Sequence, residues 1–169
     1  SGEGGEAPLM NTPSFNARAT AQMVMKALLN VLPDIDVKAM HHRVVRGDFD
    51  TGKDLIDHPT TKLEGKRIAI LGYGNIGREV ALLAKAFAME VVVFARSRHQ
   101  TWIESEGFIY SDSIEAAMTG AEVVSPHLGL GANQCNVGIL DKTVLAKLNQ
   151  EAVLINYDRG ELVECEALE

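Results

Sequence analysis

A glycine-rich turn between two apolar runs constrains the fold of this chain more than any other feature. The apolar run 68–71 is rich in branched residues and too short for a helix, which is typical of a buried parallel strand. A helical pattern over 76–87 and a second apolar run, 91–94, follow it. The turn between the first run and the helix has the spacing G-x-G-x-x-G, formed by Gly72, Gly74 and Gly77. This order predicts a strand–helix–strand unit.

Each glycine has its own task if the unit binds a dinucleotide. Gly72 permits the tight turn, Gly74 lets a pyrophosphate approach the backbone, and Gly77 lets the helix pack closely on the strand. The first turn of the helix presents free N–H groups and the positive end of its dipole to the phosphates. A structural turn can match the glycine spacing by accident, but the complete strand–turn–helix setting favours dinucleotide binding.

The end of the second strand predicts which cofactor is bound. An acidic residue there would accept a hydrogen bond from the adenosine 2′-hydroxyl of NAD, but that position falls near Ala95. Arg96, Ser97 and Arg98 follow instead, and two guanidinium groups with a hydroxyl suit a 2′-phosphate. We therefore predict NADP rather than NAD. The alternative is that both arginines are solvated charges on a surface turn.

The rest of the chain continues the alternation of strands and helices. Further strands are predicted at 107–110, 122–125 and 152–156, with helices at 99–106, at 113–118 with Ser113 or Asp112 as its cap, at 141–148, and from 161 onward. The predicted fold class is α/β, a Rossmann-type doubly wound parallel sheet in three αβα layers. Ligands bind at the carboxyl ends of the strands in such sheets. Gly72, Arg96, His127 and the segment 156–159 all fall at those ends.

The residues before this sheet predict a separate organisation. We expect a flexible arm at 1–10, crossover helices and a polar loop at 11–62, and the dinucleotide-binding domain at 63–169. A helix over 16–32 is apolar around much of its circumference, which predicts packing against its own sheet and against a second domain or subunit. We therefore expect an interdomain or dimerisation helix and a homodimer. His41 and His42 diverge by about 100° on a second helix, so no metal site is predicted.

Composition excludes several classes of partner. The net charge of −7 argues against nucleic acid and anionic membranes. No apolar run reaches membrane-spanning length and no signal-peptide pattern is present, so a soluble cytoplasmic protein is expected. Cys135 and Cys165 form no CxxC motif and are expected to be reduced thiols.

Four segments in this order resemble a known family. They are 63–66 (LEGK), 72–77 (GYGNIG), 125–128 (SPHL) and 155–163 (INYDRGELV). Together they are similar to the cofactor domain of the D-isomer-specific 2-hydroxyacid dehydrogenases, which include phosphoglycerate dehydrogenase-like and glyoxylate/hydroxypyruvate reductase-like enzymes. The likeness covers about 11–169, where Asn11, Thr12 and Pro13 look like the crossover from a substrate domain.

The resemblance implies hydride transfer between nicotinamide C4 and C2 of a small 2-oxo or D-2-hydroxy acid. It implies that Arg159 pairs with the substrate carboxylate and polarises the carbonyl. Asn75 and Ile76 would lie against the pyrophosphate. The nicotinamide side would be lined by His127 and by the strand-end segment Asn156, Tyr157 and Asp158. The alternatives are a surface ion pair for Arg159 and a loop histidine with satisfied hydrogen bonds for His127.

The chain also departs from the family pattern. Asp158 stands where a small residue is usual, and Gly129 and Gly131 stand where proline and threonine are frequent, which predicts a looser loop. The family's catalytic glutamate and histidine lie beyond the Arg159–Gly160 motif, and its substrate domain lies mostly before the crossover. We therefore expect the cofactor domain of a larger enzyme, binding dinucleotide with little turnover. The alternatives are a non-catalytic dinucleotide-binding regulatory or scaffold module, and another Rossmann oxidoreductase or hydrolase.

Overall fold

The computed structural model describes residues 15–32, 36–54 and 62–168. The predicted flexible arm at 1–10 and the crossover residues Asn11, Thr12 and Pro13 lie outside the described residues. The same holds for 55–61 of the predicted loop and for Glu169. No described helix combines the length and the apolar character needed to cross a membrane.

The core of the molecule is a five-stranded sheet in the order β3-β2-β1-β4-β5, in which every pair of neighbours is parallel. The strands are β1 (Arg67–Leu71), β2 (Glu90–Phe94), β3 (Ile109–Ser111), β4 (Val123–Pro126) and β5 (Val153–Leu154). Leu71 pairs with Phe94 on one side and with Pro126 on the other, so the three central strands end at the same level. This arrangement confirms the predicted α/β doubly wound fold.

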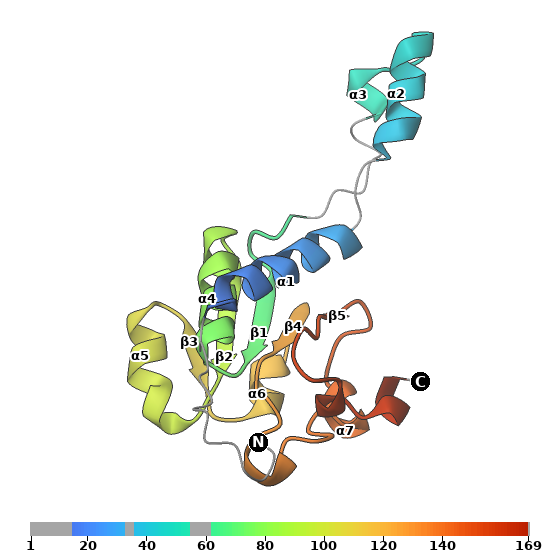
Figure 1. Cartoon of the computed structure of the whole chain (residues 1–169). Coiled ribbons are helices and arrows are strands. Elements are labelled where there is room, and N and C mark those ends of the chain that lie inside the picture. Colours follow the sequence, from blue (N-terminus) through green and yellow to red (C-terminus); the bar gives the residue numbers. More distant parts are fainter. Residues whose placement is uncertain (1–14, 33–35, 55–61, 169) are drawn as a thin grey trace, which may run out of the picture.

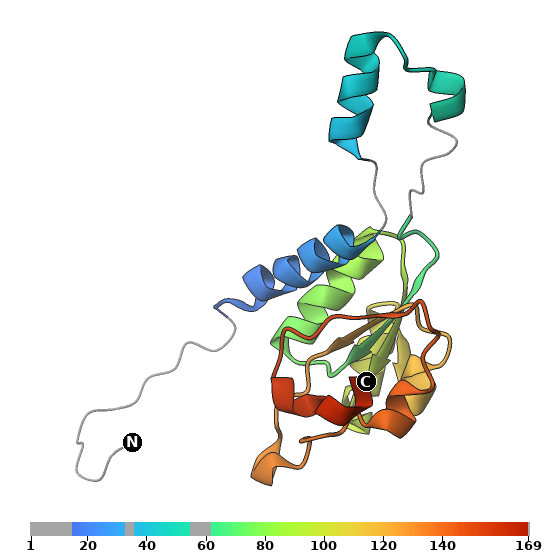
Figure 2. The ribbon, with the colours of Figure 1, turned by 90° about the vertical axis from the view of Figure 1, so that its right-hand side faces the viewer.

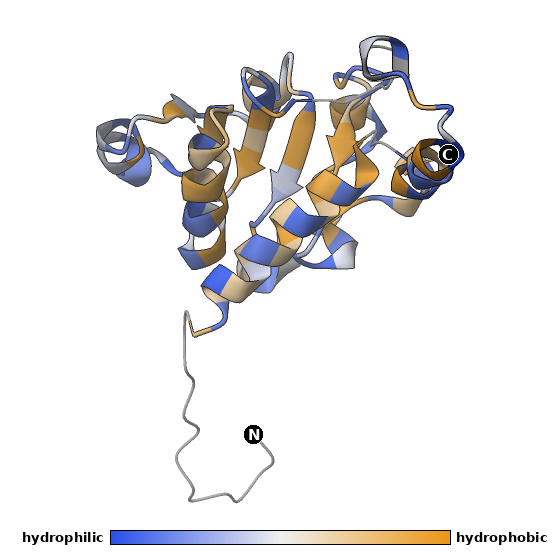
Figure 3. Ribbon diagram, turned by 90° about the horizontal axis from the view of Figure 1, so that it is seen from above, coloured by the Kyte–Doolittle hydropathy of each residue, from blue (hydrophilic) through white to orange (hydrophobic). Residues whose placement is uncertain are grey.

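Helices cover both faces of the sheet because successive strand residues point to opposite sides. Ile68 and Ile70 pack with α1 (Ala17–Val31), α4 (Asn75–Ala86) and α5 (Gln100–Ser105). Ala69 and Leu71 pack with α6 (Ile114–Met118) and α7 (Lys142–Leu145). Figure 1 shows the two helix layers, and Figure 3 shows the hydrophobic strands enclosed between helices of mixed hydropathy.

Helix α1 lies along α4 and covers part of one face of the domain (Figure 2). Its buried stripe consists of Ala17, Ala21, Val24, Met25 and Leu28. Met23, on the side of the helix that faces away from this stripe, is 44% exposed, and Val31, near the C-terminal end of the helix, is 58% exposed. The helix therefore packs on its own domain, as predicted, and still presents apolar surface.

Two short helices stand apart from the sheet in Figures 1 and 2: α2 (Val37–Arg46) and α3 (Thr51–Asp54). Asp36 caps α2 by accepting the N–H of Ala39 at 2.9 Å, and no residue of α2 is buried. The sequence predicted a loop where α3 forms. Asp50 accounts for the difference, because its carboxylate accepts the N–H of Gly52 at 2.9 Å and so starts a single helical turn.

The C-terminal elements are shorter than predicted. Helix α7 is one turn long, β5 pairs through two residues, and the helix predicted from 161 onward is replaced by two 3₁₀ turns, η3 (Gly160–Leu162) and η4 (Cys165–Leu168). Tertiary pairing is the cause. The carbonyls of Glu161 and Leu162 accept the N–H groups of Gly138 and Leu140, at 2.8 and 3.0 Å, and so cannot bond along a helix. The same pairing buries Leu162 completely.

Candidate functional site

The fold itself requires glycine at two of the three motif positions, Gly72 and Gly77. Gly72 has a φ of +109°, and a Cβ atom there would lie 2.3 Å from the carbonyl oxygen of His127. A Cβ atom at Gly77 would lie 2.1 Å from the carbonyl oxygen of Gly72. Real Cβ atoms do not approach so closely, so the turn from β1 into α4 cannot form with side chains at these two positions.

Gly74 is different, because nothing in the described chain opposes a side chain there. It is the N-cap of α4, with a φ of −86°, and no heavy atom lies within 4 Å of the place where its Cβ would stand. A glycine with open space in front of it is expected where a ligand must approach the backbone. The environment of this residue therefore fits a bound pyrophosphate.

The start of α4 supplies the donors for such a ligand. The first bond of the helix runs from the N–H of Arg78 to the carbonyl oxygen of Gly74, at 3.0 Å. The N–H groups of Asn75, Ile76 and Gly77 precede it, and no side chain caps this end of the helix. Free N–H groups and the positive end of the helix dipole favour an anion here.

Two cavities flank this turn at the carboxyl edge of the sheet. One, of about 280 Å³, lies toward β4 and β5 and is lined by Asn16, Ala17, Gly74, Asn75, Ile76, Gly77, His127, Leu128, Gly129 and Asp158. The other, of about 860 Å³, lies toward β2 and β3. Its lining includes Gly72, Tyr73, Phe94, Arg96, Ser97, Arg98, His99, Tyr110, Asp112, Cys135 and Asn136. Gly74 and His127 belong to both, so the two cavities meet at the turn.

The larger cavity contains a cluster of cationic side chains. Arg96, Ser97 and Arg98 are exposed at its rim, directly after β2. Neither arginine forms an ion pair with another residue in the described ranges. Arg98 donates from Nε to Nε2 of His99 at 3.2 Å, and partial burial, together with the two arginines, lowers the pKa of His99. Asp112 supplies a single carboxylate on the same wall.

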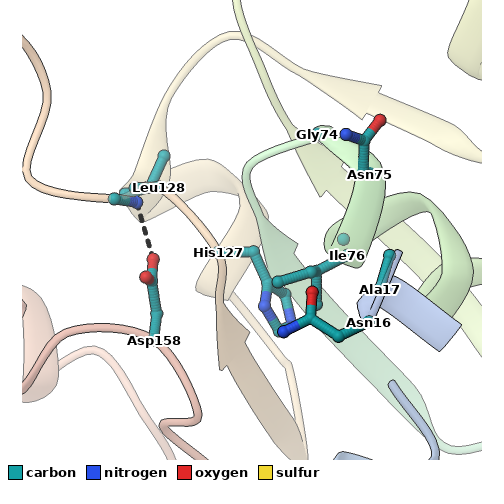
Figure 4. Close-up of a pocket in the computed structure, with 10 residues that line it drawn as sticks. Asn16, Ala17, Gly74, Asn75, Ile76, His127, Leu128 and Asp158 are labelled. Carbon is teal, nitrogen blue, oxygen red and sulfur yellow. Dashed lines mark hydrogen bonds between the residues drawn. The ribbon is translucent and has the colours of Figure 1, made fainter. Parts of the chain in front are cut away.

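His127 follows β4 and separates the two cavities. Its Nε2 lies 2.8 Å from the hydroxyl oxygen of Ser125, and its backbone N–H donates to the carbonyl oxygen of Leu71 at 2.6 Å. Burial lowers the pKa of His127 to about 4, while the charge of Asp158 acts in the opposite direction. The imidazole is therefore neutral at pH 7. Figure 4 shows it beneath the turn, beside Ile76 and Asn16.

The segment after β5 is folded into a tight turn by Asn156. Its Oδ1 accepts the N–H of Asp158 at 2.9 Å, and its Nδ2 donates to the carbonyl oxygen of Arg159 at 3.0 Å. This turn directs the Asp158 carboxylate to the loop after β4, where Oδ2 accepts the N–H of Gly129 at 2.6 Å (Figure 4). Tyr157 and Arg159 are exposed.

Hydrogen bonds fix the loop after β4 at Gly129, where the sequence predicted a looser conformation. Gly129 has a φ of +59°, which proline cannot adopt, and Gly131 has a φ of +73°, which a β-branched threonine rarely adopts. Asn136 donates from Nδ2 to the carbonyl oxygen of Gly129 at 3.0 Å, so Gly129 is bonded on both its N–H and its carbonyl side. A proline at 129 would have no N–H to donate to Asp158. The departures from the family pattern at 129 and at 158 are therefore the two partners of one hydrogen bond.

A polar network holds the start of α4 against α5. Arg78 donates from Nε to Glu106 at 2.9 Å, and Tyr73 also hydrogen-bonds this carboxylate. The guanidinium carbon of Arg78 lies 5.4 Å from the centroid of the Trp102 ring. The Arg78 bond is the main cause that lowers the pKa of Glu106. Because Arg78 is paired in this way, the donors that this turn offers to an anion are its backbone N–H groups.

Most of the predicted site residues come together at this edge. Those that line one or both cavities are Gly72, Gly74, Asn75, Ile76, Gly77, Arg96, Ser97, Arg98, His127 and Asp158. Asn156, Tyr157 and Arg159 line neither cavity, and Asn156 acts by shaping the turn. Sequence reasoning missed Asn16, which comes from the start of the long helix, and Asp112 at the end of β3. The strand-end rule could have found Asp112, but no local signal points to Asn16.

The comparisons with known proteins agree with this geometry. The sequence profile of the "D-isomer specific 2-hydroxyacid dehydrogenase, NAD binding domain" family matches residues 25–169. Glyoxylate reductase of Aeropyrum pernix is 30% identical over 94% of this chain and 47% of its own length. Hydroxypyruvate reductase of Blautia hydrogenotrophica is 26% identical over 92% of this chain and 47% of its own length.

A solved structure gives the same result in three dimensions. The TT0316 protein of Thermus thermophilus superposes with a TM-score of 0.69 at 30% identity, covering 94% of this chain and 47% of that one. The chain thus spans about half the length of these relatives. From the matched profile, the parallel sheet and the glycine turn, we conclude that the chain belongs to the D-isomer-specific 2-hydroxyacid dehydrogenase family and corresponds to its NAD-binding domain.

Proposed function

We propose that this chain is the cofactor half of an oxidoreductase that transfers hydride between a nicotinamide dinucleotide and a small D-2-hydroxy or 2-oxo acid. The observation that carries the proposal is Gly74. Its missing side chain faces open space at the N-terminus of α4, between two cavities that meet at the carboxyl edge of the sheet. Relatives named glyoxylate reductase and hydroxypyruvate reductase support the substrate class.

The two cavities suit the two halves of the cofactor. The pyrophosphate would rest on the N–H groups of Asn75 and Ile76. The adenosine half would extend over the end of β2 into the larger cavity, and the nicotinamide would extend toward β4 and β5 into the smaller one. Their volumes are comparable to the roughly 300–1,000 Å³ of ordinary ligand sites. Once bound, the nicotinamide supplies the hydride chemistry, and the residues of this chain orient it.

A preference for NADP is the second part of the proposal. Arg96 and Arg98 stand at the rim of the larger cavity without an ion-pair partner among the described residues. Ser97 between them adds a hydroxyl. This set can bind a 2′-phosphate through charge-assisted hydrogen bonds. Asp112 is the carboxylate on the same wall that could instead favour a free ribose hydroxyl, which makes NAD the alternative.

The chemistry of the smaller cavity supports our proposal that the described residues bind the dinucleotide with little turnover of their own. Reduction of a carbonyl requires a proton donor close to the reacting oxygen. Within the described lining of this cavity, the titratable side chains are His127 and Asp158. The imidazole is neutral because its pKa is about 4, and the carboxylate is an acceptor. We propose that a proton donor comes from outside this set, and that Arg159, exposed next to Asp158, pairs with the substrate carboxylate.

Calorimetric titration with NADPH and NADH tests the proposal directly. We expect both cofactors to bind, NADPH more tightly. At a ligand concentration of 100 times Kd, binding should stabilise the folded chain by about 2.7 kcal/mol and raise its melting temperature. Chemical shift changes should be concentrated in the amides of 71–78, where the turn and the first turn of α4 lie. If saturating cofactor changes neither the melting temperature nor these amides, the proposed function is wrong.

A further inference from the structure

Asp158 gives the smaller cavity a definite electrostatic character. Among the described residues that line this cavity, it is the only one with a charged side chain at neutral pH. The other titratable group, His127, is neutral because burial lowers its pKa to about 4. The side chains around this cavity therefore contribute one negative charge, whereas the larger cavity is lined by two arginines.

The position of this charge is fixed from both sides. Oδ2 accepts the N–H of Gly129 at 2.6 Å, which ties the carboxylate to the loop after β4. The backbone N–H of Asp158 donates to Asn156 at 2.9 Å, which holds the residue in the turn after β5. Figure 4 shows the carboxylate pointing to the loop on the wall of the cavity across from Ile76 and Asn16. A charge held in this way does not need to reorganise when a ligand enters.

The part of the ligand that meets Asp158 follows from the proposed function, on which this inference rests. The pyrophosphate site at Gly74 lies between the cavities, and the arginines of the larger cavity suit the phosphorylated adenosine half. The nicotinamide half then enters the smaller cavity. The oxidised nicotinamide ring carries one positive charge, and the reduced ring carries none. Attraction to a carboxylate therefore distinguishes the two forms.

We propose that Asp158 is a specificity-determining residue for the oxidation state of the cofactor, and that it makes this site bind NADP⁺ in preference to NADPH. The attraction acts on the ring only, because the two forms share every other group. By linkage, each tenfold preference for the oxidised form lowers the reduction potential of the bound two-electron couple by about 30 mV. The bound reduced cofactor is then a stronger hydride donor, which favours reduction of a 2-oxo acid.

The experiment compares dissociation constants for NADP⁺ and NADPH, measured by calorimetry on the full chain and on Asp158→Asn. The amide oxygen of asparagine can still accept the N–H of Gly129, so the variant removes the charge and keeps the hydrogen bond. We expect the ratio Kd(NADPH)/Kd(NADP⁺) to fall about fivefold to tenfold in the variant. Asp158→Ser, which is smaller and also uncharged, should lower the ratio to a similar extent.

Asp112→Asn is the matched control, because it removes the same charge from the larger cavity. It should change the affinities for NADP⁺ and NADPH together and leave their ratio as in the unmodified chain. An unchanged ratio in Asp158→Asn or Asp158→Ser, with both cofactors bound, overturns this inference and leaves the proposed function standing. Failure of the unmodified chain to bind either cofactor at millimolar concentration overturns both.

Discussion

At the residue scale, the three motif glycines differ in the atoms that a side chain at each position would contact. Gly72 and Gly77 are closed by backbone atoms 2.3 and 2.1 Å from a Cβ, so the protein needs them in order to fold. Gly74 has no neighbour within 4 Å, so the fold leaves room for a side chain there and does not itself require glycine. The spacing in the sequence predicted all three, because the motif is local. The motif also predicted the role of each glycine, but it could not predict that the carbonyl group of His127 closes the space at Gly72, because His127 follows a distant strand.

The first prediction separates these two roles. Gly74→Val should reduce dinucleotide affinity by at least tenfold, because its side chain would occupy the approach to the N–H groups of α4, while the free energy of unfolding changes by less than about 1 kcal/mol. Gly77→Ala should instead destabilise the chain by several kcal/mol through the clash with Gly72. Thermal unfolding and calorimetric titration of both variants measure the contrast. Undiminished affinity in Gly74→Val would show that the phosphates bind elsewhere.

The second prediction concerns the rim of the larger cavity. Replacing Arg96 and Arg98 together with alanine should weaken NADPH binding by about 10²-fold, because two charge-assisted phosphate contacts of about 1.5 kcal/mol each are lost. NADH binding should change by less than threefold. Arg46→Ala on α2, where the arginine pairs with Asp48 at 3.2 Å, is the control for lost positive charge. Equal losses for both cofactors in the double variant would refute the 2′-phosphate assignment.

At the element scale, α4 is held in place by contacts that a local pattern does not reveal. The helix itself was predictable from its apolar periodicity. Its orientation depends on Arg78 and Glu106, which are far apart in the sequence and meet only when α5 packs beside α4. The same reasoning explains why the C-terminal helix was predicted too long. The carbonyls of Glu161 and Leu162 bond to a segment more than twenty residues earlier, and periodicity carries no information about that pairing.

The third prediction tests the link between α4 and α5. Glu106→Gln should destabilise the chain by about 1 kcal/mol at pH 7, a value kept small because the Arg78 side chain is 35% exposed. The pKa of Glu106 is lowered in the folded state, so its contribution is fully present above the unfolded value of about 4.3. It is lost as the pH falls through the lower folded-state pKa. Denaturant unfolding between pH 7 and pH 3 measures the difference between the two chains.

That difference should be constant from pH 7 to about pH 5 and should shrink below about pH 4. Glu115→Gln is the control, because Glu115 is an exposed glutamate on α6. A Glu106→Gln chain as stable as the unmodified one at pH 7 would mean that the Arg78–Glu106 pair contributes nothing measurable to the fold. In that case the packing of α1 on α4 would be the principal support for the turn from β1 into α4.

At the scale of the whole molecule, the strand order was not specified by the sequence but follows from general rules. A run of strands and helices predicts a parallel doubly wound sheet, and the order β3-β2-β1-β4-β5 is one such sheet. The position of α1 could not be predicted in the same way. Its apolar circumference indicated two partners, and the structure identifies one of them as α4. The remaining apolar side chains of α1 are the basis for the proposed homodimer.

The fourth prediction is that two copies of the chain associate through α1. Met23 and Val31 lie about 80° apart around the helix: Met23 faces away from the stripe that packs on α4, and Val31 borders that stripe at the C-terminal end of the helix, where it is exposed. Sedimentation should detect a dimer at tens of micromolar, where a free energy of about −7 kcal/mol is sufficient.

Replacing Met23 and Val31 with glutamate should give a monomer with an unchanged melting temperature, because neither side chain belongs to the core. Val137→Glu, at an exposed apolar position in the loop after η2 (Ala132–Gln134), should leave the dimer intact. A clean monomer of the unmodified chain at this concentration would mean that the exposed apolar side chains of α1 do not join two copies of the chain.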